Sequence, residues 1–269
     1  MPAGVGAILL RIPVVVAEQN AVPGLANTII GKFAKACAVS YDGTDLPRSV
    51  WTGNPVRPEI LDVAAGVTSR ESAREALGID ADRTLVVVFG GSLGARTINN
   101  AVVGAVSELA GRGDLEIRHI IGTRDFADVT GRISLGPDAA LRYTPVEYEH
   151  DMASVYAACD LVICRAGATS CAELSVTGTP SVLIPLPGAP GDHQTANGRA
   201  LAGPGGAEII KDADFGPEQF VETVTRLVSD PDTLQTMKRQ AKSVGRPDAA
   251  SAVVDVVEEH RSAQIGGAL

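Results

Sequence analysis

Short runs of aliphatic residues recur along the chain, separated by longer stretches in which apolar residues return every three or four positions. The short runs are typical of buried strands, and the wider spacing is typical of amphipathic helices. The pattern predicts strands at residues 12–16, 37–40, 85–89, 117–121, 161–164 and 181–185. It predicts helices at residues 25–36, 95–110, 152–158, 172–176, 195–202, 217–227 and 249–261. Asp214 and a proline in the first turn are expected to open the helix at 217–227.

Strands that alternate with helices in this way pair in parallel, because parallel pairing needs a crossover connection. The predicted fold class is therefore α/β. At about 150 residues per domain, 269 residues make one large or two modest domains. We place a boundary in the proline-containing stretch at 52–61, between a first piece at residues 1–56 and a larger domain at 57–247. The first piece is too small to be stable alone, and the C-terminal helix at 248–262 is expected to cover it.

Composition excludes several classes of protein. With 45% hydrophobic residues and a mean hydropathy of +0.14 the chain is too apolar for disorder, yet no apolar run approaches the roughly 20 residues that span a bilayer. A net charge of −9 and a pI near 5.0 argue against nucleic acid as a partner. The four cysteines form no CxxC pair and the first ten residues lack a basic leader, so we expect buried thiols and a cytoplasmic protein. The four histidines show no metal-ligand spacing, so no metal site is expected.

The strongest local signal is LVVVFGGSLGA at residues 85–95, a buried strand that runs through a glycine-rich turn into a helix. Backbone N–H groups and the positive end of the helix dipole make an anion site there, and the Ser92 hydroxyl adds a donor. The alternative interpretation is a tight turn with a capping serine. The pattern is neither a P-loop nor a GxGxxG dinucleotide fingerprint.

A second strand, turn and helix follow in DLVICRAGATSCAE at residues 160–173. Ser170 and Glu173 match the S-x-x-E capping box, which accounts for both residues without a ligand. Alternatively, the loop amides hold a phosphate and the Glu173 carboxylate binds a ribose diol. The spacing alone leaves both interpretations open.

A third polar cluster lies in PLPGAPGDHQTAN at residues 185–197. Asp192 is expected to cap the helix that follows. Asp192, His193 and Gln194 lie at the end of a strand, where open α/β sheets bind ligands, so recognition of sugar hydroxyls is a reasonable interpretation. The alternative is a stiff connection without a ligand.

In the first piece, the strand at 12–16 delivers the tetrapeptide Ala-Glu-Gln-Asn at residues 17–20. These polar groups are well placed to face a cleft. The alternative is a turn into the next helix with Asn20 as its cap.

Five segments together closely resemble the MurG family, the peptidoglycan N-acetylglucosamine transferases of the GT-B fold: AEQNAVPGLAN at 17–27, TGNPVR at 52–57, GGSLGAR at 90–96, RAGATSCAEL at 165–174 and PLPGAPGDHQTANGRAL at 185–201. The resemblance implies two Rossmann-like domains, the first of them truncated. It implies an inverting transfer of GlcNAc from UDP-GlcNAc to the undecaprenyl-linked muramyl pentapeptide, lipid I, which gives lipid II. This activity requires no metal or other cofactor. The resemblance also implies a peripheral enzyme on the inner face of the plasma membrane, in contact with other cell-wall synthesis proteins.

The family's nucleotide-binding residues carry over to this sequence by position. Ser92 would contact the diphosphate and Arg57 the nucleotide. Glu149 would contact the uracil through its backbone, and Glu173 would bind the ribose diol.

The sugar-binding residues of the family carry over in the same way. Ala168, Thr169 and Ser170 would line the phosphate and the sugar. Gln194 would bind the GlcNAc hydroxyls, and Asn20 would reach in from the first domain.

Two departures from the family pattern concern the acceptor. Ala17 replaces the family's histidine before Glu-Gln-Asn, and the family's glycine-rich GGTGGH loop and GGY segment would lie before Met1. We therefore expect a donor site that is present and an acceptor site that is incomplete, with the sequence truncated or Met1 a misplaced start. Glu18, or the histidine of the absent loop, is the candidate base, because inversion needs a proton acceptor opposite the departing UDP.

Three rival interpretations remain. A GT-B relative would use another UDP-sugar or a lipid acceptor such as diacylglycerol, and the donor preference set by residues 192–195 would decide this. A UDP-GlcNAc-binding protein without catalysis would bind the donor and never turn it over. A dinucleotide oxidoreductase is disfavoured, because GGSLGA lacks the GxGxxG spacing and no acidic residue on the following strand is arranged to hold an adenosine ribose.

Overall fold

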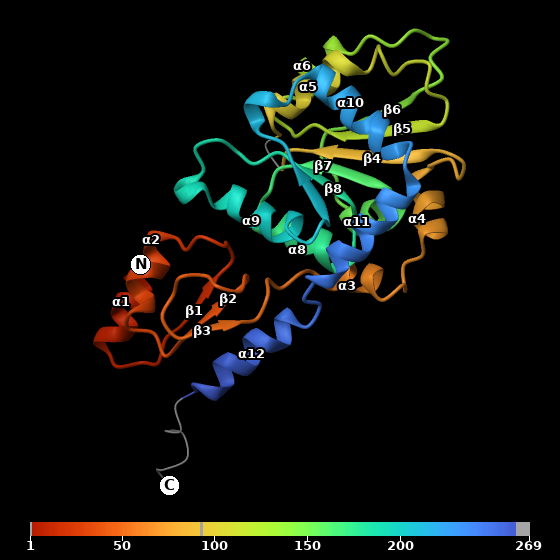
Figure 1. The fold of residues 1–269 in the computed structure, drawn as a ribbon. Coiled ribbons are helices and arrows are strands. Elements are labelled where there is room, and N and C mark those ends of the chain that lie inside the picture. The colour runs from red at the N-terminus through yellow and green to blue at the C-terminus, as the bar shows by residue number, and fades with distance from the viewer. Residues whose placement is uncertain (1, 92–93, 262–269) are drawn as a thin grey trace.

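The computed structural model describes residues 2–91 and 94–261 and contains two sheets (Figure 1). The strands are β1 Val15–Glu18, β2 Ala36–Val39, β3 Ser49–Trp51, β4 Thr84–Phe89, β5 Leu115–Ile120, β6 Arg142–Val146, β7 Leu161–Cys164, β8 Ser181–Leu183 and β9 Ala207–Ile209. The smaller sheet has the order β1-β2-β3 and the larger the order β6-β5-β4-β7-β8-β9. Every strand pair is parallel, which confirms the predicted α/β class.

Strand β4 lies at the centre of the larger sheet. The chain builds outward from it through β5 to β6, then returns to add β7, β8 and β9 on the other side. This doubly wound order reverses between β4 and β7, which leaves a crevice beyond the carboxyl ends of these two strands. The aliphatic run of β4 suits a central parallel strand, because such a strand is covered on both faces. Its residues Leu85, Val86, Val87 and Val88 are completely buried.

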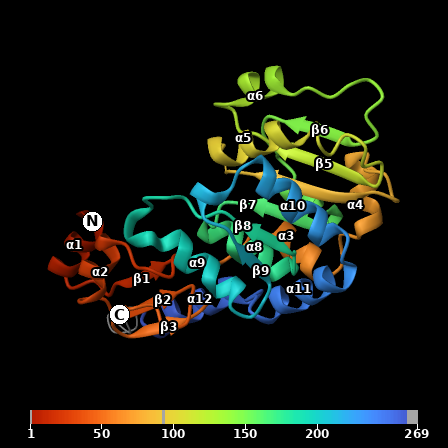
Figure 2. The same cartoon turned by 45° about the horizontal axis from the view of Figure 1, so that its top comes forward.

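The larger sheet is accompanied by helices α3 Pro58–Ala64, α4 Arg70–Leu77, α5 Arg96–Ala105, α6 Phe126–Arg132, α7 Met152–Ala158, α8 Ala168–Thr177, α9 His193–Ala202, α10 Pro217–Val228 and α11 Pro231–Ser243. Side chains alternate along β4, so its two faces belong to different cores. Val86 and Val88 pack with α5 and α10, whereas Leu85 and Val87 pack with α3, α4, α7 and α8. Figure 2 shows these helices on the two faces of the sheet.

The smaller sheet is accompanied by helices from both ends of the chain, α1 Pro2–Leu9, α2 Leu25–Gly31 and α12 Ala249–Glu259. Ile30 of α2 shares a small core with Val16 and Cys37, and α12 packs against β1 and β2. The segment before α12 crosses the linker at Gly53, whose φ is +83°. A Cβ atom there would lie 2.5 Å from Cβ of Arg246, so the crossing requires glycine.

The pattern of apolar residues misses β6 and β9, which lie at the two edges of the larger sheet. Edge strands bury little surface, so their sequences lack the continuous aliphatic run of the central strands. The predicted helix at 25–36 ends at Gly31 instead, and the helix predicted at 172–176 begins at Ala168. Helix α11 is not predicted, because its sequence is mostly polar. Asp214 does not open α10, which follows an N-cap at Gly216.

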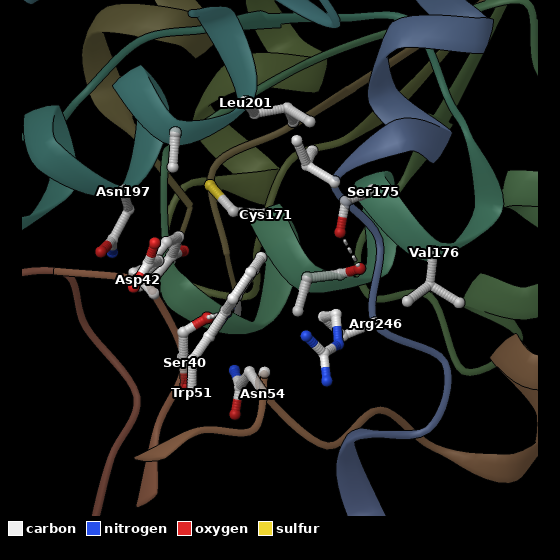
Figure 3. A pocket seen from close by; sticks show the side chains of 15 residues that line it. Ser40, Asp42, Trp51, Asn54, Cys171, Ser175, Val176, Asn197, Leu201 and Arg246 are labelled. Atoms are coloured by element: carbon white, nitrogen blue, oxygen red, sulfur yellow. Dashed lines mark hydrogen bonds between the residues drawn. The ribbon is translucent and has the colours of Figure 1, made fainter. Parts of the chain in front are cut away.

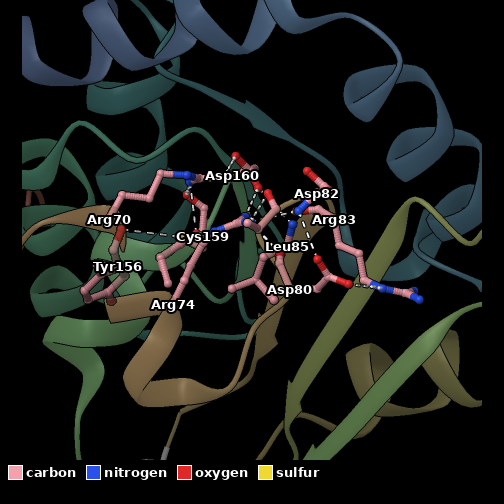
Figure 4. Close-up of polar contacts among 11 residues, drawn as sticks. Arg70, Arg74, Asp80, Asp82, Arg83, Leu85, Tyr156, Cys159 and Asp160 are labelled. Atoms are coloured by element: carbon pink, nitrogen blue, oxygen red, sulfur yellow. Dashed lines mark hydrogen bonds and ion pairs between the residues drawn. The ribbon is translucent and has the colours of Figure 1, made fainter. Parts of the chain in front are cut away.

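An ion network ties α4 to the amino-terminal edge of the larger sheet, away from the crevice (Figure 4). Asp160, directly before β7, accepts hydrogen bonds from Arg70 Nη2 at 2.7 Å, Arg74 Nη2 at 2.9 Å and the Leu85 amide at 2.8 Å. The buried Arg74 guanidinium also donates to the carbonyls of Ala158, Asp80, Ala81 and Arg83. A buried charge that is satisfied in this way holds elements together and needs no ligand.

The four cysteines, Cys37, Cys159, Cys164 and Cys171, are free and buried, as predicted. Burial raises the pKa of Cys159 to about 12, so this thiol stays protonated at neutral pH. Across residues 2–91 and 94–261, no helix is long and apolar enough to cross a membrane.

Candidate functional site

A cleft of about 510 Å³ opens beyond the carboxyl ends of β4 and β7, at the crevice left by the strand order. It is formed by the turn after β4, the start of α8 and the connection from β8 to α9. Two of the predicted site residues, Ser170 and Gln194, line it. Ser92, the predicted diphosphate contact, lies outside the described residues.

The turn after β4 requires glycine at two positions. A Cβ atom on Gly90 would lie 2.3 Å from the Ala95 amide nitrogen. One on Gly94, whose φ is +77°, would lie 2.2 Å from the Ile121 carbonyl oxygen. The turn leads straight into α5, whose N-cap Ala95 supplies no side-chain cap. The positive end of α5 therefore lies at the cleft, which favours an anion there.

The charged side chains that line the cleft are mostly basic. Arg165 pairs with Asp212 at 2.5 Å, and Arg124 pairs with Asp125 at 2.7 Å. Arg96 also lines the cleft, 3.5 Å from the same Asp125 carboxylate. Two carboxylates thus face three guanidinium groups, and the remaining positive charge suits a diphosphate.

Helix α8 carries three predicted residues, of which Ser170 lines the cleft. Because its N-cap is Gly167, Ala168, Thr169 and Ser170 form its first turn. The capping-box interpretation of Ser170 and Glu173 is wrong, since both residues lie inside the helix. Gly167 has no side chain to cap the helix, so a second positive helix end meets the cleft.

Glu173 and Arg57, both predicted to contact the nucleotide, bind each other. Glu173 Oε1 accepts from Arg57 Nη2 at 3.1 Å and from Arg57 Nε at 3.3 Å, and Glu173 Oε2 accepts from the Tyr156 hydroxyl at 3.1 Å. The Glu173 side chain is 6% exposed, whereas that of Arg57 is 52% exposed. Burial, and then the charge of Glu173, raises the pKa of Tyr156, so its hydroxyl remains a donor. The carboxylate is therefore fixed before any ligand arrives.

Gln194 stands in the first turn of α9. Its Oε1 accepts from the Leu186 amide at 2.9 Å, which fixes the carboxamide plane. Asp192 occupies the N-cap position, as predicted, but with a φ of +54° and no bond to a helix amide. Its carboxylate accepts from the Thr195 hydroxyl at 2.7 Å instead. The predicted N-cap position of Asp192 is therefore confirmed, but its side chain does not cap a helix amide.

Glu18, the candidate base, is the buried last residue of β1 and lies next to the loop that carries Asn20. Its carboxylate accepts from the Asn20 and Gly24 amides, both at 2.9 Å, and from Asn27 Nδ2 at 2.9 Å. Burial by itself raises the pKa of Glu18, but these hydrogen bonds and a weaker one from the Asn20 side chain together bring the pKa below 4.5. A carboxylate with a lowered pKa and four hydrogen bonds is a poor proton acceptor.

Asn197, completely buried on α9, joins the first piece to the larger domain. Its Oδ1 accepts from the Ala21 amide at 2.8 Å. Its Nδ2 donates to Asn20 Oδ1 at 3.1 Å and to the Ala166 carbonyl at 3.2 Å. The loop that carries Asn20 is therefore held beside the loop between β7 and α8.

Glu149 follows β6, and its side chain is committed to the fold. Glu149 Oε2 accepts from Arg118 Nη2 at 2.6 Å and from Arg118 Nε at 3.1 Å, while Oε1 accepts from the Asp151 amide at 3.1 Å. Only the backbone of Glu149 is then available to a ligand, which is compatible with the predicted backbone contact.

Two family models match the chain. Residues 85–253 match the glycosyltransferase family 28 C-terminal domain, and residues 1–39 match the glycosyltransferase family 28 N-terminal domain. The chain is 41% identical over 261 residues to the UDP-N-acetylglucosamine--N-acetylmuramyl-(pentapeptide) pyrophosphoryl-undecaprenol N-acetylglucosamine transferase of Nocardioides sp., covering 96% of this chain and 69% of that protein. It is 36% identical over 255 residues to the transferase of the same name from Acetivibrio thermocellus, covering 93% and 67%.

A solved structure agrees with this. The crystal structure of MurG from Acinetobacter baumannii superposes with a TM-score of 0.77 at 32% identity, covering 96% of this chain and 70% of that one. The chain belongs to the MurG family. The predicted family and the predicted GT-B fold are thereby confirmed.

Some groups at the MurG-type cleft escape the sequence patterns. Arg96 and Arg165 lie within the segments at 90–96 and 165–174, and Arg124 lies outside all five, but no binding role is predicted for any of the three from the sequence. Their convergence depends on the strand order. Asn197 carries a signal that could have been used, because it follows Gln194 by three residues and so lies on the same face of a helix. An asparagine inside a helix is also unfavourable, which points to a role outside the helix itself.

Proposed function

We propose that this chain transfers GlcNAc from UDP-GlcNAc to lipid I, the reaction for which its MurG relatives are named. The proposal rests on the cleft at the switch point, which is the place between β4 and β7 where the strand order reverses. The N-termini of α5 and α8 and a surplus of guanidinium groups converge there. A nucleoside diphosphate sugar supplies the matching negative charge. The same groups would stabilise the charge on the departing UDP.

On the donor side, we propose that the first turns of α5 and α8 hold the diphosphate, with Ser92 and with Ala168, Thr169 and Ser170 beside it. Glu173 binds the ribose diol with the carboxylate that Tyr156 and Arg57 already orient. Gln194 turns its Nε2 group to the GlcNAc hydroxyls. The backbone of Glu149 contacts the uracil.

On the acceptor side, we propose a positioning role for Glu18 in place of a role as base. Its hydrogen bonds to the loop after β1 set the place of Asn20, which Asn197 holds from the other side. Asn20 would then reach the sugar from the first piece. The exposed Ala17 leaves no imidazole at this point of the loop.

The lipid acceptor implies work at a membrane surface. We propose that the protein acts on the inner face of the plasma membrane as a peripheral enzyme, alongside other cell-wall synthesis proteins. Lipid I brings its undecaprenyl chain to the membrane, so the enzyme needs only to dock there.

The first experiment is a calorimetric titration of the purified chain with UDP-GlcNAc, with UDP-glucose and NAD as controls. Selective binding of UDP-GlcNAc supports the donor site, and equal binding of UDP-glucose contradicts the proposed specificity. A second assay supplies lipid I and follows release of UDP. Binding without turnover favours a UDP-GlcNAc-binding protein, which is the alternative that Ala17 favours.

A further inference from the structure

A second cavity lies between the first piece and the larger domain (Figure 3). Its volume is about 250 Å³, and it shares no lining residue with the cleft at the switch point. The loop after β2, the linker after β3, helices α8 and α9 and the segment before α12 enclose it. Small apolar side chains such as Ala172, Ala200 and Val244 make up much of its wall.

Asn54 brings an unsatisfied polar group into this cavity. It is 6% exposed, and neither its Nδ2 nor its Oδ1 has a hydrogen-bond partner among the described residues. Leaving a buried carboxamide without partners costs its full desolvation penalty, so native structures rarely keep one without a reason. Pro55 restricts the backbone of Asn54, the residue before it, and Asn54 lines the cavity.

Trp51 and Arg246 form a flat wall next to Asn54 (Figure 3). The indole Nε1 donates to the Ser40 carbonyl at 3.2 Å, which fixes the plane of the ring. The guanidinium carbon of Arg246 lies 4.7 Å from the ring centroid. Asp42 lines the same cavity, so one positive and one negative side chain balance, and the cavity favours a neutral ligand.

We propose that this cavity binds a neutral, planar heterocycle with an amide edge, of the lactam class. The carboxamide of Asn54 presents one donor and one acceptor side by side, and a lactam offers the complementary pair. The apolar wall and the Trp51 ring would cover the faces of the heterocycle. The bound molecule would touch both halves of the protein, because its lining comes from both.

The test uses the fact that Trp51 is the only tryptophan of the chain. Its indole N–H gives a single resonance in a proton–nitrogen correlation spectrum, and this resonance reports on the cavity. The probe is 2-pyridone, with pyridine as a matched control that lacks the amide edge. We expect saturable shifts of the Trp51 resonance with 2-pyridone and a response to pyridine that is about tenfold weaker or absent. No saturable shift with 2-pyridone would mean that water alone satisfies Asn54, and the proposal would be wrong.

Two variants locate the binding. Asn54→Leu removes the donor and the acceptor at similar volume, and Ala200→Leu fills the cavity from an exposed helix position that carries little risk for folding. Each is expected to weaken 2-pyridone binding about tenfold or more. Ala127→Leu, on the exposed face of α6, is the control and should leave binding unchanged.

The titration is repeated with saturating UDP in the cleft at the switch point. Unchanged 2-pyridone binding supports a separate site. Loss of the Trp51 shifts in the presence of UDP would place 2-pyridone in that cleft and overturn the proposal, whether or not UDP-GlcNAc proves to be the donor.

Discussion

Asn197 Nδ2 lies 3.1 Å from Asn20 Oδ1, and this contact joins helix α9 to the loop that follows β1. With the bonds from the Ala21 amide and to the Ala166 carbonyl, one buried side chain connects the first piece to two parts of the larger domain. Because Asn20 is also bound to Glu18, the two halves are coupled through a chain of hydrogen bonds.

Asn197→Ala should therefore break the junction. It leaves the Ala21 amide and Asn20 Oδ1 without their partner, and we expect a loss of about 2–3 kcal/mol in the free energy of unfolding by urea. Hydrogen exchange of the Ala21 amide should accelerate. Asn100→Ala, at an exposed position of α5, is the control and should change stability by less than about 0.5 kcal/mol. Equal effects of the two substitutions would contradict the role of Asn197.

The local elements around the cleft can be predicted from the sequence. The hydrogen bonds that join distant segments cannot, because they depend on how the chain folds. The run of aliphatic residues in β4 and the glycines after it predict the strand, the turn and the following helix correctly, because these are local features, whereas the cleft depends on the strand order. The bonds of Glu18 depend on the path of the loop to Asn27, and the partners of Asn197 lie far away in the sequence. The small and polar residues before Ala172 show no helical pattern of apolar positions, so the sequence does not indicate that α8 begins at Ala168. The capping-box interpretation depends on a later helix start.

Substitution of Arg57, which pairs with Glu173, can distinguish a role in ligand binding from a role in stability. Arg57 is half exposed, so the ion pair contributes at most about 1 kcal/mol to folding. If Arg57 contacts the nucleotide, Arg57→Ala should weaken UDP-GlcNAc binding about tenfold in calorimetry while thermal unfolding stays nearly unchanged. Arg132→Ala, which breaks an exposed pair with Asp128, is the matched control for binding. A large loss of stability without a loss of affinity would assign the pair to the fold alone.

The proposed contact between the Glu173 carboxylate and the ribose diol can be tested by substitution of Glu173 itself. Glu173→Gln keeps the shape and two polar atoms but removes the charge that accepts from Arg57 and from the proposed ribose diol. We expect UDP-GlcNAc affinity to fall about tenfold. Tyr156→Phe removes only the supporting hydroxyl and should cost about 1 kcal/mol in stability with a smaller effect on affinity. If Glu173→Gln leaves affinity intact, the proposed ribose contact is wrong.

Two of the three glycines in the turn after β4, Gly91 and Gly94, make a matched pair. A Cβ atom at Gly94 would meet the Ile121 carbonyl oxygen, whereas one at Gly91 meets nothing within 4 Å, and both residues have positive φ. Gly91→Ala should cost ~1–2 kcal/mol through its backbone angle alone. Gly94→Ala adds a clash with the backbone and should cost about 3 kcal/mol or more, and it should also reduce UDP-GlcNAc binding. Urea unfolding and calorimetry on both variants check this, and equal losses would show that the close approach is unimportant.

His119 makes stability depend on pH. It is buried between Tyr143 and Asn99, and burial lowers its pKa from 6.5 to about 3. The unfolded chain takes up a proton below pH 6.5 whereas the folded chain does not, so stability falls as pH decreases from 6.5 toward 3 and is fully present above 6.5. Between pH 7.5 and 5.5 the expected loss is about 1.4 kcal/mol in the free energy of unfolding by urea. His119→Gln should lower stability at pH 7.5 and remove this difference between the two pH values, while His150→Gln, at an exposed site, should retain it. A difference that persists in His119→Gln would assign the pH dependence to other groups.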